Sequence, residues 1–276
     1  LALVLGFQAT QATRKFNDEL QPLRNFKNTY DGFSPRVGAL YEFGPGLQVF
    51  SNVSGVYEPP SFGELVQAVI QPRLRAQKGT SYEVGSRGQL GGGWWDFAYY
   101  YVDLKDELLT QRNNIGQTLT LNVPATYHQG IEFAGLLPLP ADFYLRGSYL
   151  WNDFRFDDDL VFGNNRLPGI PPQYVQAEVG WSRNELYAAL FTEWVPEKYP
   201  VDMVNAVFAD PYATLGAKVG QRRRTGFSWF VEGRNLTDQK FAATTGVTLD
   251  ARLPGANRQF NPGDGRAFYA GIEWNL

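Results

Sequence analysis

Apolar and polar residues alternate with a period of two over most of this chain. In the closing stretch "FYAGIEWNL", the even-numbered positions include Phe268, Ile272 and Trp274. The odd-numbered positions include Glu273 and Asn275, so the two sets differ in parity and would lie on opposite faces of a strand. The stretches "FYLRGSYLWNDF" and "FSWFVEGRNL" follow the same rule. A period of two is typical of a strand with one apolar and one polar face. The pattern therefore predicts an all-β chain.

The alternating segments predict about twelve strands, whose ends are uncertain by about 2–4 residues. They cover residues 1–14, 33–43, 47–57, 79–89, 94–108, 124–135, 142–154, 172–182, 186–195, 211–221, 226–235 and 265–276. A tilted strand needs about 9–11 residues to cross a membrane, whereas strands in soluble proteins average about 5–6 residues. Most of the predicted strands have the membrane-crossing length.

The links between these strands alternate between short and long. The short links are 44–46, 90–93, 137–141, 183–185 and 222–225, and the long ones are 15–32, 58–78, 109–123, 155–171, 196–210 and 236–264. In an up-and-down sheet this order places all short links on one edge and all long links on the other. Outer-membrane barrels have this arrangement, and a Greek-key sandwich has no reason to keep it. The links predict a transmembrane antiparallel up-and-down β-barrel.

Charged and aromatic residues also fit a membrane barrel. A Lys or Arg at the lipid midplane costs about 2–4 kcal/mol, so Arg146 and Arg234, on polar faces, should point into a wet lumen. Aromatic rings near strand ends predict two girdles at the membrane interfaces. They are Tyr41, Phe43, Trp94, Trp95, Phe143, Trp181, Phe227 and Trp274 at the short-link edge, and Tyr57, Trp151, Phe154 and Trp194 at the other. The apolar face is therefore expected to meet outer-membrane lipid.

Composition narrows the choice of function. Aromatic residues make up 15% of the chain, beside 29 Gly and 17 Pro, which favours strands joined by many turns. The net charge of −3 gives no basic surface for nucleic acid. The chain has no Cys, which excludes disulfides and thiolate metal sites. No apolar run approaches the roughly 18 residues of a membrane helix.

Several motifs carry a family resemblance. They are "SNVSGVYEPPSFGEL", "AQKGTSYEVGSRG", "WDFAYYYVDLKDEL", "TYHQGIE", "GNNRLPGIPP", and "EGRNLTDQKFAA" followed by "GDGRAFYAGIEW". Their order resembles the C-terminal part of the barrel of TonB-dependent outer-membrane receptors, and is similar to ferric-siderophore receptors. The resemblance covers nearly all of residues 1–276.

The resemblance implies a barrel of about 22 strands that is filled by an N-terminal plug. Residues 1–276 would then be its C-terminal portion, with the plug and TonB box lying outside this chain. The alternating start "LALVLGFQAT" agrees, because it reads as a strand rather than as a signal peptide. Implied partners are TonB, through the plug, and the barrel assembly machinery, through the last strand. Family members usually end on an aromatic residue, whereas this chain ends on Leu276.

Ligand contacts are expected in the long links, which would face the cell exterior. A metal-siderophore ligand is often anionic and has aromatic walls, so basic and aromatic side chains are the candidates. They are Arg73, Arg75, Lys78, Tyr57, Phe162, Trp194, Tyr199, Arg252 and Arg258.

Other motifs favour structural roles. His128 is the single histidine and lies within a predicted strand, Asp157–Asp159 lacks the EF-hand spacing, and Arg222–Arg224 falls in a short link. In "RNLTDQKF", Asn235 and Asp238 can bond the local backbone. No P-loop, nucleophile elbow or GxGxxG is present, so neither an enzyme nor a bound cofactor or metal is predicted.

The function predicted from sequence is active import of a scarce metal chelate, with a ferric siderophore as the first choice. Receptors for haem, copper chelates, cobalamin or oligosaccharides would share this barrel. A passive diffusion porin is the first rival class. A barrel protease or lipase is the second, but its catalytic triad or acidic dyad is not found in the sequence.

Overall fold

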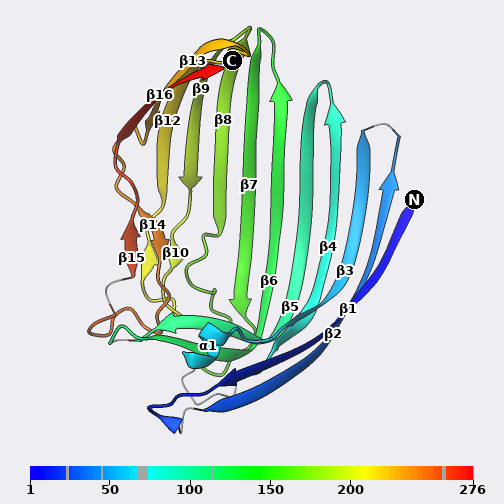
Figure 1. The fold of residues 1–276 in the computed structure, drawn as a ribbon, viewed down its shortest axis with the longest axis vertical. Coiled ribbons are helices and arrows are strands. Elements are labelled where there is room, and N and C mark those ends of the chain that lie inside the picture. Colours follow the sequence, from blue (N-terminus) through cyan, green and yellow to red (C-terminus); the bar gives the residue numbers. More distant parts are fainter. Residues whose placement is uncertain (23–24, 45, 68–73, 114, 257–258, 276) are drawn as a thin grey trace.

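The computed structural model describes residues 1–22, 25–44, 46–67, 74–113, 115–256 and 259–275. Within them the chain forms a 12-stranded antiparallel meander (Figure 1). Its strands are β1 (Ala2–Phe16), β2 (Phe26–Glu42), β3 (Leu47–Glu58), β4 (Gln77–Leu90), β5 (Gly93–Arg112), β6 (Thr118–Pro138), β7 (Phe143–Phe156), β8 (Gln173–Arg183), β9 (Leu186–Val195), β12 (Tyr212–Gln221), β13 (Gly226–Arg234) and β16 (Ala267–Asn275).

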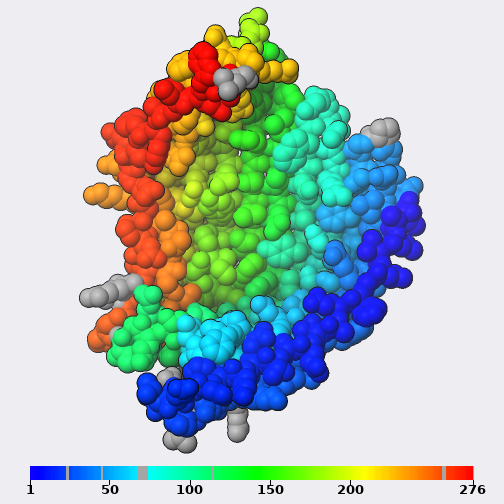
Figure 2. All heavy atoms as spheres, viewed as in Figure 1, coloured from blue at the N-terminus to red at the C-terminus, as the bar shows by residue number. Residues whose placement is uncertain are grey.

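Each of the predicted strands is present in this sheet, so the all-β, up-and-down prediction is confirmed. The sheet begins at β1 and ends at β16, and these two strands form its two edges. Figure 2 shows a hollow whose floor is formed by the central strands and whose rim carries both ends of the sequence. The chain is therefore a curved, open wall rather than a closed barrel.

Short and long links lie on opposite edges of the sheet, as predicted. Two of the predicted long links, 15–32 and 109–123, are wrong in extent. The β1–β2 pair continues to Phe16 opposite Phe26, and the β5–β6 pair continues to Arg112 opposite Thr118. In the β5–β6 extension, Leu109, Leu119 and Leu121 share one face and alternate with polar residues, so the period of two continues through a segment predicted as a link.

The long links contain short elements that the alternation did not predict. They are α1 (Phe62–Val66) and two small hairpins, β10 (Tyr199–Pro200) with β11 (Phe208–Ala209) and β14 (Ala242–Thr245) with β15 (Phe260–Pro262). Ser61 starts α1 with a capping box, because its hydroxyl accepts from the Glu64 N–H and the Glu64 carboxylate accepts from the Ser61 N–H. Among the described residues, no helix has the length and apolar content needed to cross a bilayer.

The two faces of the wall differ in chemistry. On the convex face, Leu145, Val179 and Leu190 stand side by side across three strands, and all are exposed. On the concave face, Arg146 and Glu178 are directly opposite each other. This difference confirms the predicted alternation of an apolar outer face and a polar inner face.

The aromatic residues near the short-link edge follow the same division. Phe143 pairs with Trp181, and Phe227 pairs with Trp274, all on the convex face. Trp94 is an exception, because it lines a cavity on the concave side. At the long-link edge, Phe154 stacks on His128 (ring centroids 4.2 Å apart) instead of facing outward.

Candidate functional site

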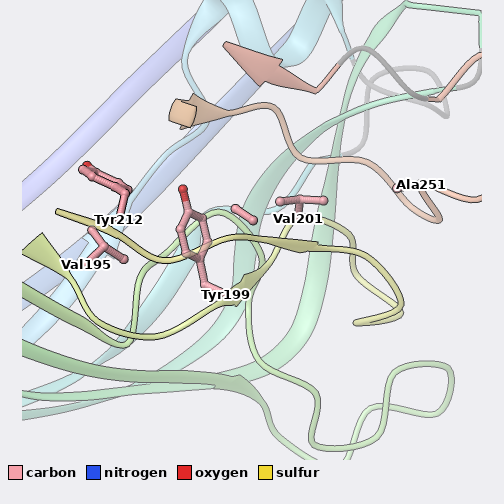
Figure 3. Packing of buried hydrophobic residues seen from close by; sticks show 6 residues of the cluster. Val195, Tyr199, Val201, Tyr212 and Ala251 are labelled. Atoms are coloured by element: carbon pink, nitrogen blue, oxygen red, sulfur yellow. The ribbon is translucent and has the colours of Figure 1, made fainter. Parts of the chain in front are cut away.

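The long links pack together at one end of the wall and share two small apolar cores. The first core contains Val195, Tyr199, Val201, Ala209, Tyr212 and Ala251, most of which are labelled in Figure 3. The second contains Val123, Phe156, Leu167 and Met203. Both cores bring together residues from several links, so these links form one packed unit rather than separate loops.

Asp202 organises this unit from its centre. Its side chain is fully buried, and Oδ1 accepts from the Ala206 N–H at 2.8 Å. Oδ2 accepts from the Ala251 N–H at 3.0 Å, which joins the β9–β12 link to the last link. A buried carboxylate is tolerated when backbone donors surround it.

Asn205 joins the same region to the β7–β8 link. Its Oδ1 accepts from the Arg166 N–H and its Nδ2 donates to the Arg166 carbonyl, both at 2.9 Å. Asn165 adds a bond from Nδ2 to the Met203 carbonyl at 3.0 Å. No local pattern in the sequence predicts this network, because short polar residues in a link are common and the pairing is long-range.

The tip of the β5–β6 hairpin contacts the last link. The Arg112 N–H donates to the Val247 carbonyl at 2.8 Å, and Arg112 bridges Thr248. Between these segments lies a cavity of about 400 Å³ whose lining includes Asn113, Gly116 and Gln259. The hairpin therefore does not stand free of the packed loops.

The concave face holds a larger cavity, of about 680 Å³, over strands β5 to β16. Its lining includes Arg146, Gln176, Glu178, Phe191, Glu193, Thr214, Arg234 and Tyr269. Arg146 donates to both oxygens of Glu178, at 3.0 and 3.1 Å. Arg146 and Arg234 both line this cavity, which confirms their predicted place on the inner face.

Charges in this cavity are paired within the wall. Arg234 Nε donates to Glu232 Oε1 at 2.5 Å, and the Lys218 ammonium lies 3.2 Å from Glu232 Oε2. The Arg234 guanidinium also lies 4.8 Å from the ring centre of Tyr269. The cavity lining therefore combines paired positive and negative side chains with an aromatic ring, so it is a polar surface.

Two of the predicted basic ligand residues are engaged in internal ion pairs. Arg75 donates from Nε (2.8 Å) and Nη2 (2.5 Å) to Asp106 Oδ1, and this contact raises the pKa of Arg75. Arg252 forms a two-pronged pair with Asp250, at 2.9 and 2.7 Å. The Arg252 guanidinium, together with its backbone N–H, holds the pKa of the Asp250 carboxyl down at about 2.

The predicted aromatic ligand residues have structural positions. Tyr199 is 3% exposed in the first loop core, where burial raises the pKa of its hydroxyl. Phe162 packs on Phe156 with ring centroids 4.8 Å apart. Trp194 pairs with Val175 and Ala213 on the convex face. The prediction that these three rings form a ligand wall is therefore not supported by their placement.

Lys78 and Tyr57 are directly opposite each other on neighbouring strands, with the ammonium 5.9 Å from the ring centre. Lys78 shares its parity with the exposed Tyr82 and Val84, which places it on the convex face. Arg73 and Arg258 lie outside the described residues. The described members of the predicted ligand set are therefore not gathered into one site.

The motifs assigned structural roles keep them. Asn235 donates to the carbonyls of Gln239 and Asp264, both at 2.9 Å, where β13 ends. Asp238 accepts from the Arg266 N–H at 3.0 Å. His128 lies 3.3 Å from Glu107 Oε2. No group of acidic and His side chains that could hold a metal ion occurs in the described part of the chain.

An antiparallel meander with a polar concave face, an apolar convex face and packed links along one edge defines part of the wall of a large β-barrel. Residues 1–236 match the family "TonB dependent receptor-like, beta-barrel". The chain belongs to this family.

Among curated relatives, the metal-pseudopaline receptor CntO of Pseudomonas aeruginosa is 24% identical over 170 residues, which are 59% of this chain and 23% of the relative. The copper transporter OprC superposes with a TM-score of 0.82 at 16% identity, covering 99% of this chain and 44% of OprC. The siderophore receptor PiuA of Acinetobacter baumannii gives 0.74 at 13%, covering 98% and 40%. The chain thus spans less than half of each of these proteins.

Proposed function

We propose that this chain is the C-terminal portion of the barrel of an outer-membrane receptor that imports a metal chelate, with a ferric siderophore as the cargo. The whole barrel would contain about 22 strands and enclose a plug. Energy would reach the plug through TonB, and the barrel assembly machinery would recognise the last strand. The apolar convex face would contact lipid.

The observation that carries the proposal is the family match over residues 1–236, on a wall with an apolar outer face and a polar inner face. The name of the relative, a metal-pseudopaline receptor, favours metal cargo over an oligosaccharide. A copper chelate, haem and cobalamin remain alternatives to a ferric siderophore. Arg73 and Arg258 stay the proposed basic contacts in the links, whereas Arg75 and Arg252 are proposed to hold the links in shape.

Transport in cells distinguishes the receptor from a passive porin. The complete receptor is supplied to a strain that lacks its other metal receptors, and uptake of radiolabelled iron bound to catecholate or hydroxamate siderophores is measured. Copper, nickel and haem are tested in parallel. Uptake at nanomolar chelate that disappears when TonB is deleted supports the receptor. Uptake that persists without TonB would establish the porin.

The loop contacts are tested by the double variant Arg73→Gln, Arg258→Gln. Each engaged, desolvated charge contributes about 1.5–3 kcal/mol, so affinity should fall roughly ten- to a hundredfold per residue. The matched control is Arg222→Gln, in a short link at the opposite edge. Normal uptake by the double variant, at normal surface expression, would show that these arginines do not contact cargo.

A further inference from the structure

The convex face carries two pairs of lysines in which like charges stand directly opposite each other. Lys15 pairs with Lys27 between β1 and β2, and Lys78 pairs with Lys105 between β4 and β5. All four side chains are exposed. Like charges directly opposite each other destabilise a sheet, because their Cβ atoms are only about 4.5–5.5 Å apart. Such pairs therefore call for an anion from outside the chain.

The wall itself does not supply that anion. None of the four lysines forms an ion pair with a carboxylate of the described residues. The nearest acid on the same face of β5 is Asp103, which is opposite Thr80 and forms no such pair either. By contrast, Lys218 on the concave face does have a carboxylate partner, Glu232.

Both pairs lie toward the long-link edge, beyond a band of aromatic rings. Tyr82 and Tyr101 are in contact with ring centroids 6.4 Å apart, and the Lys78–Lys105 pair lies four residues further along these strands. At about 3.3 Å per residue this is about 13 Å. Phe7 and Phe33, with centroids 5.6 Å apart, lie eight and six residues before Lys15 and Lys27, which is about 20–26 Å. Rings of this kind settle at the level of lipid headgroups, so the Lys78–Lys105 pair, about 13 Å beyond its rings, meets the headgroups rather than the hydrocarbon.

We propose that the Lys78–Lys105 pair is a docking site for a phosphate group of a lipid in the outer leaflet, with one phosphate bridging the two ammonium groups. The ammonium is a compact point charge that suits a phosphate oxygen. The Tyr57 ring, 5.9 Å from the Lys78 ammonium, limits where that side chain can lie. The orientation of the wall, with the long-link edge outward, rests on the proposed function.

The proposal is tested on the complete receptor in detergent micelles by native mass spectrometry. The probes are bisphosphorylated lipid A and its dephosphorylated form. The double variant Lys78→Gln, Lys105→Gln should bind the phosphorylated lipid about fivefold more weakly per lysine removed. The control Lys240→Gln removes an exposed lysine of the last link and should bind as the wild type does.

A charge reversal separates binding from folding. Lys105→Glu places a carboxylate opposite Lys78, so the sheet should be at least as stable as the wild type in lipid-free detergent. The same variant should lose the phosphorylated lipid. Unchanged lipid binding in both variants would overturn the proposal, and so would equal binding of the dephosphorylated lipid.

Two further results keep the inference separate from the proposed transport. Inorganic phosphate at millimolar concentration should not displace the lipid. If it does, the site binds free phosphate and the proposal of a lipid ligand is wrong. Lipid binding is measured on purified protein without cargo. A receptor that binds the lipid but imports no chelate would therefore refute the transport proposal alone.

Discussion

At the scale of single residues, replacing Asp202 is predicted to destabilise the packed links more than any other substitution considered below. In Asp202→Asn one carboxylate oxygen becomes an N–H donor, which leaves either the Ala206 or the Ala251 N–H without its acceptor. A buried donor without a partner costs about 1–3 kcal/mol. Hydrogen exchange of the complete receptor should accelerate in residues 199–210 and 246–251 while the strands stay protected.

The matched control is Asp210→Asn, because Asp210 is an exposed acid in the same link. It should leave exchange in both segments unchanged. Equal exchange rates in the Asp202 variant and the wild type would contradict the idea that this carboxylate joins the two links.

The Asp250–Arg252 pair predicts a defined pH window. The pKa of Asp250 is lowered from 3.8 to about 2, so the pair contributes fully above pH 3.8 and is lost as the pH falls through about 2. The fold of the last link should therefore not change between pH 4 and 8. Carbon-13 NMR should show the Asp250 carboxyl titrating near 2 in the wild type and at a higher pH in Arg252→Gln, where only the backbone N–H of residue 252 still lowers its pKa. A wild-type midpoint near 3.8 would mean that the pair does not form in solution.

The sequence identified some residues of the interior and missed others for a physical reason. Parity alone placed Arg146 and Arg234 on the inner face, because alternation along a strand is a local property. The burial of Tyr199 and of Asp202 depends on contacts between links that are far apart in the chain. No local pattern records such contacts, so an aromatic residue in a link looks the same whether it packs inward or meets a ligand.

At the scale of elements, close packing between strands makes Gly130 hard to replace. A Cβ on Gly130 would lie 2.6 Å from the Trp151 carbonyl oxygen and 2.5 Å from the Tyr100 hydroxyl. Gly130→Ala should lower stability by about 1–3 kcal/mol, measured by denaturant unfolding of the complete receptor in detergent. Gly6→Ala is the control, because no atom lies within 4 Å of its Cβ position. Equal loss in both variants would exclude this clash as the cause.

The two edges of the sheet should differ in their access to the cell exterior. Leu160→Cys, in the β7–β8 link, and Gln117→Cys, at the β5–β6 tip, are both exposed in the structure. Both should react with an impermeant maleimide on intact cells. Thr225→Cys, in the β12–β13 turn, should react only after the outer membrane is opened. The opposite labelling would reverse the proposed orientation.

Strand existence was predictable, whereas strand ends were not. Alternation over many residues identified each strand of the 12-stranded sheet. The extension of β5 and β6 to Arg112 and Thr118 was missed, although Leu109, Leu119 and Leu121 continue the alternation on one face. At the hairpin tip, Asn113 Oδ1 accepts from the N–H groups of Ile115 and Gln117. Such a turn carries no apolar signal.

At the scale of the whole molecule, the open edges limit what this segment can do alone. β1 and β16 each present one side without a partner in the sheet. Unpaired backbone groups in hydrocarbon cost several kcal/mol each, and exposed edges promote aggregation. Residues 1–276 expressed alone should aggregate or be degraded. A heat-modifiable, trypsin-resistant monomer in liposomes would contradict this.

The shared core of the long links has a consequence for how the cargo preference of the proposed receptor could change during evolution. Asp202, Asn165 and Ala251 come from three different links, yet each one holds a neighbouring link in place. Exchanging one link for that of a homologue would leave the other two links without their hydrogen-bond partners. Chimaeras with a single exchanged link should therefore be less stable and be selected against. New cargo preference would have to arise either by substitutions at the rim that spare this core or by exchange of the three links as a block. The evolvable unit at this edge is the assembly of links, and the individual link is too small to vary alone.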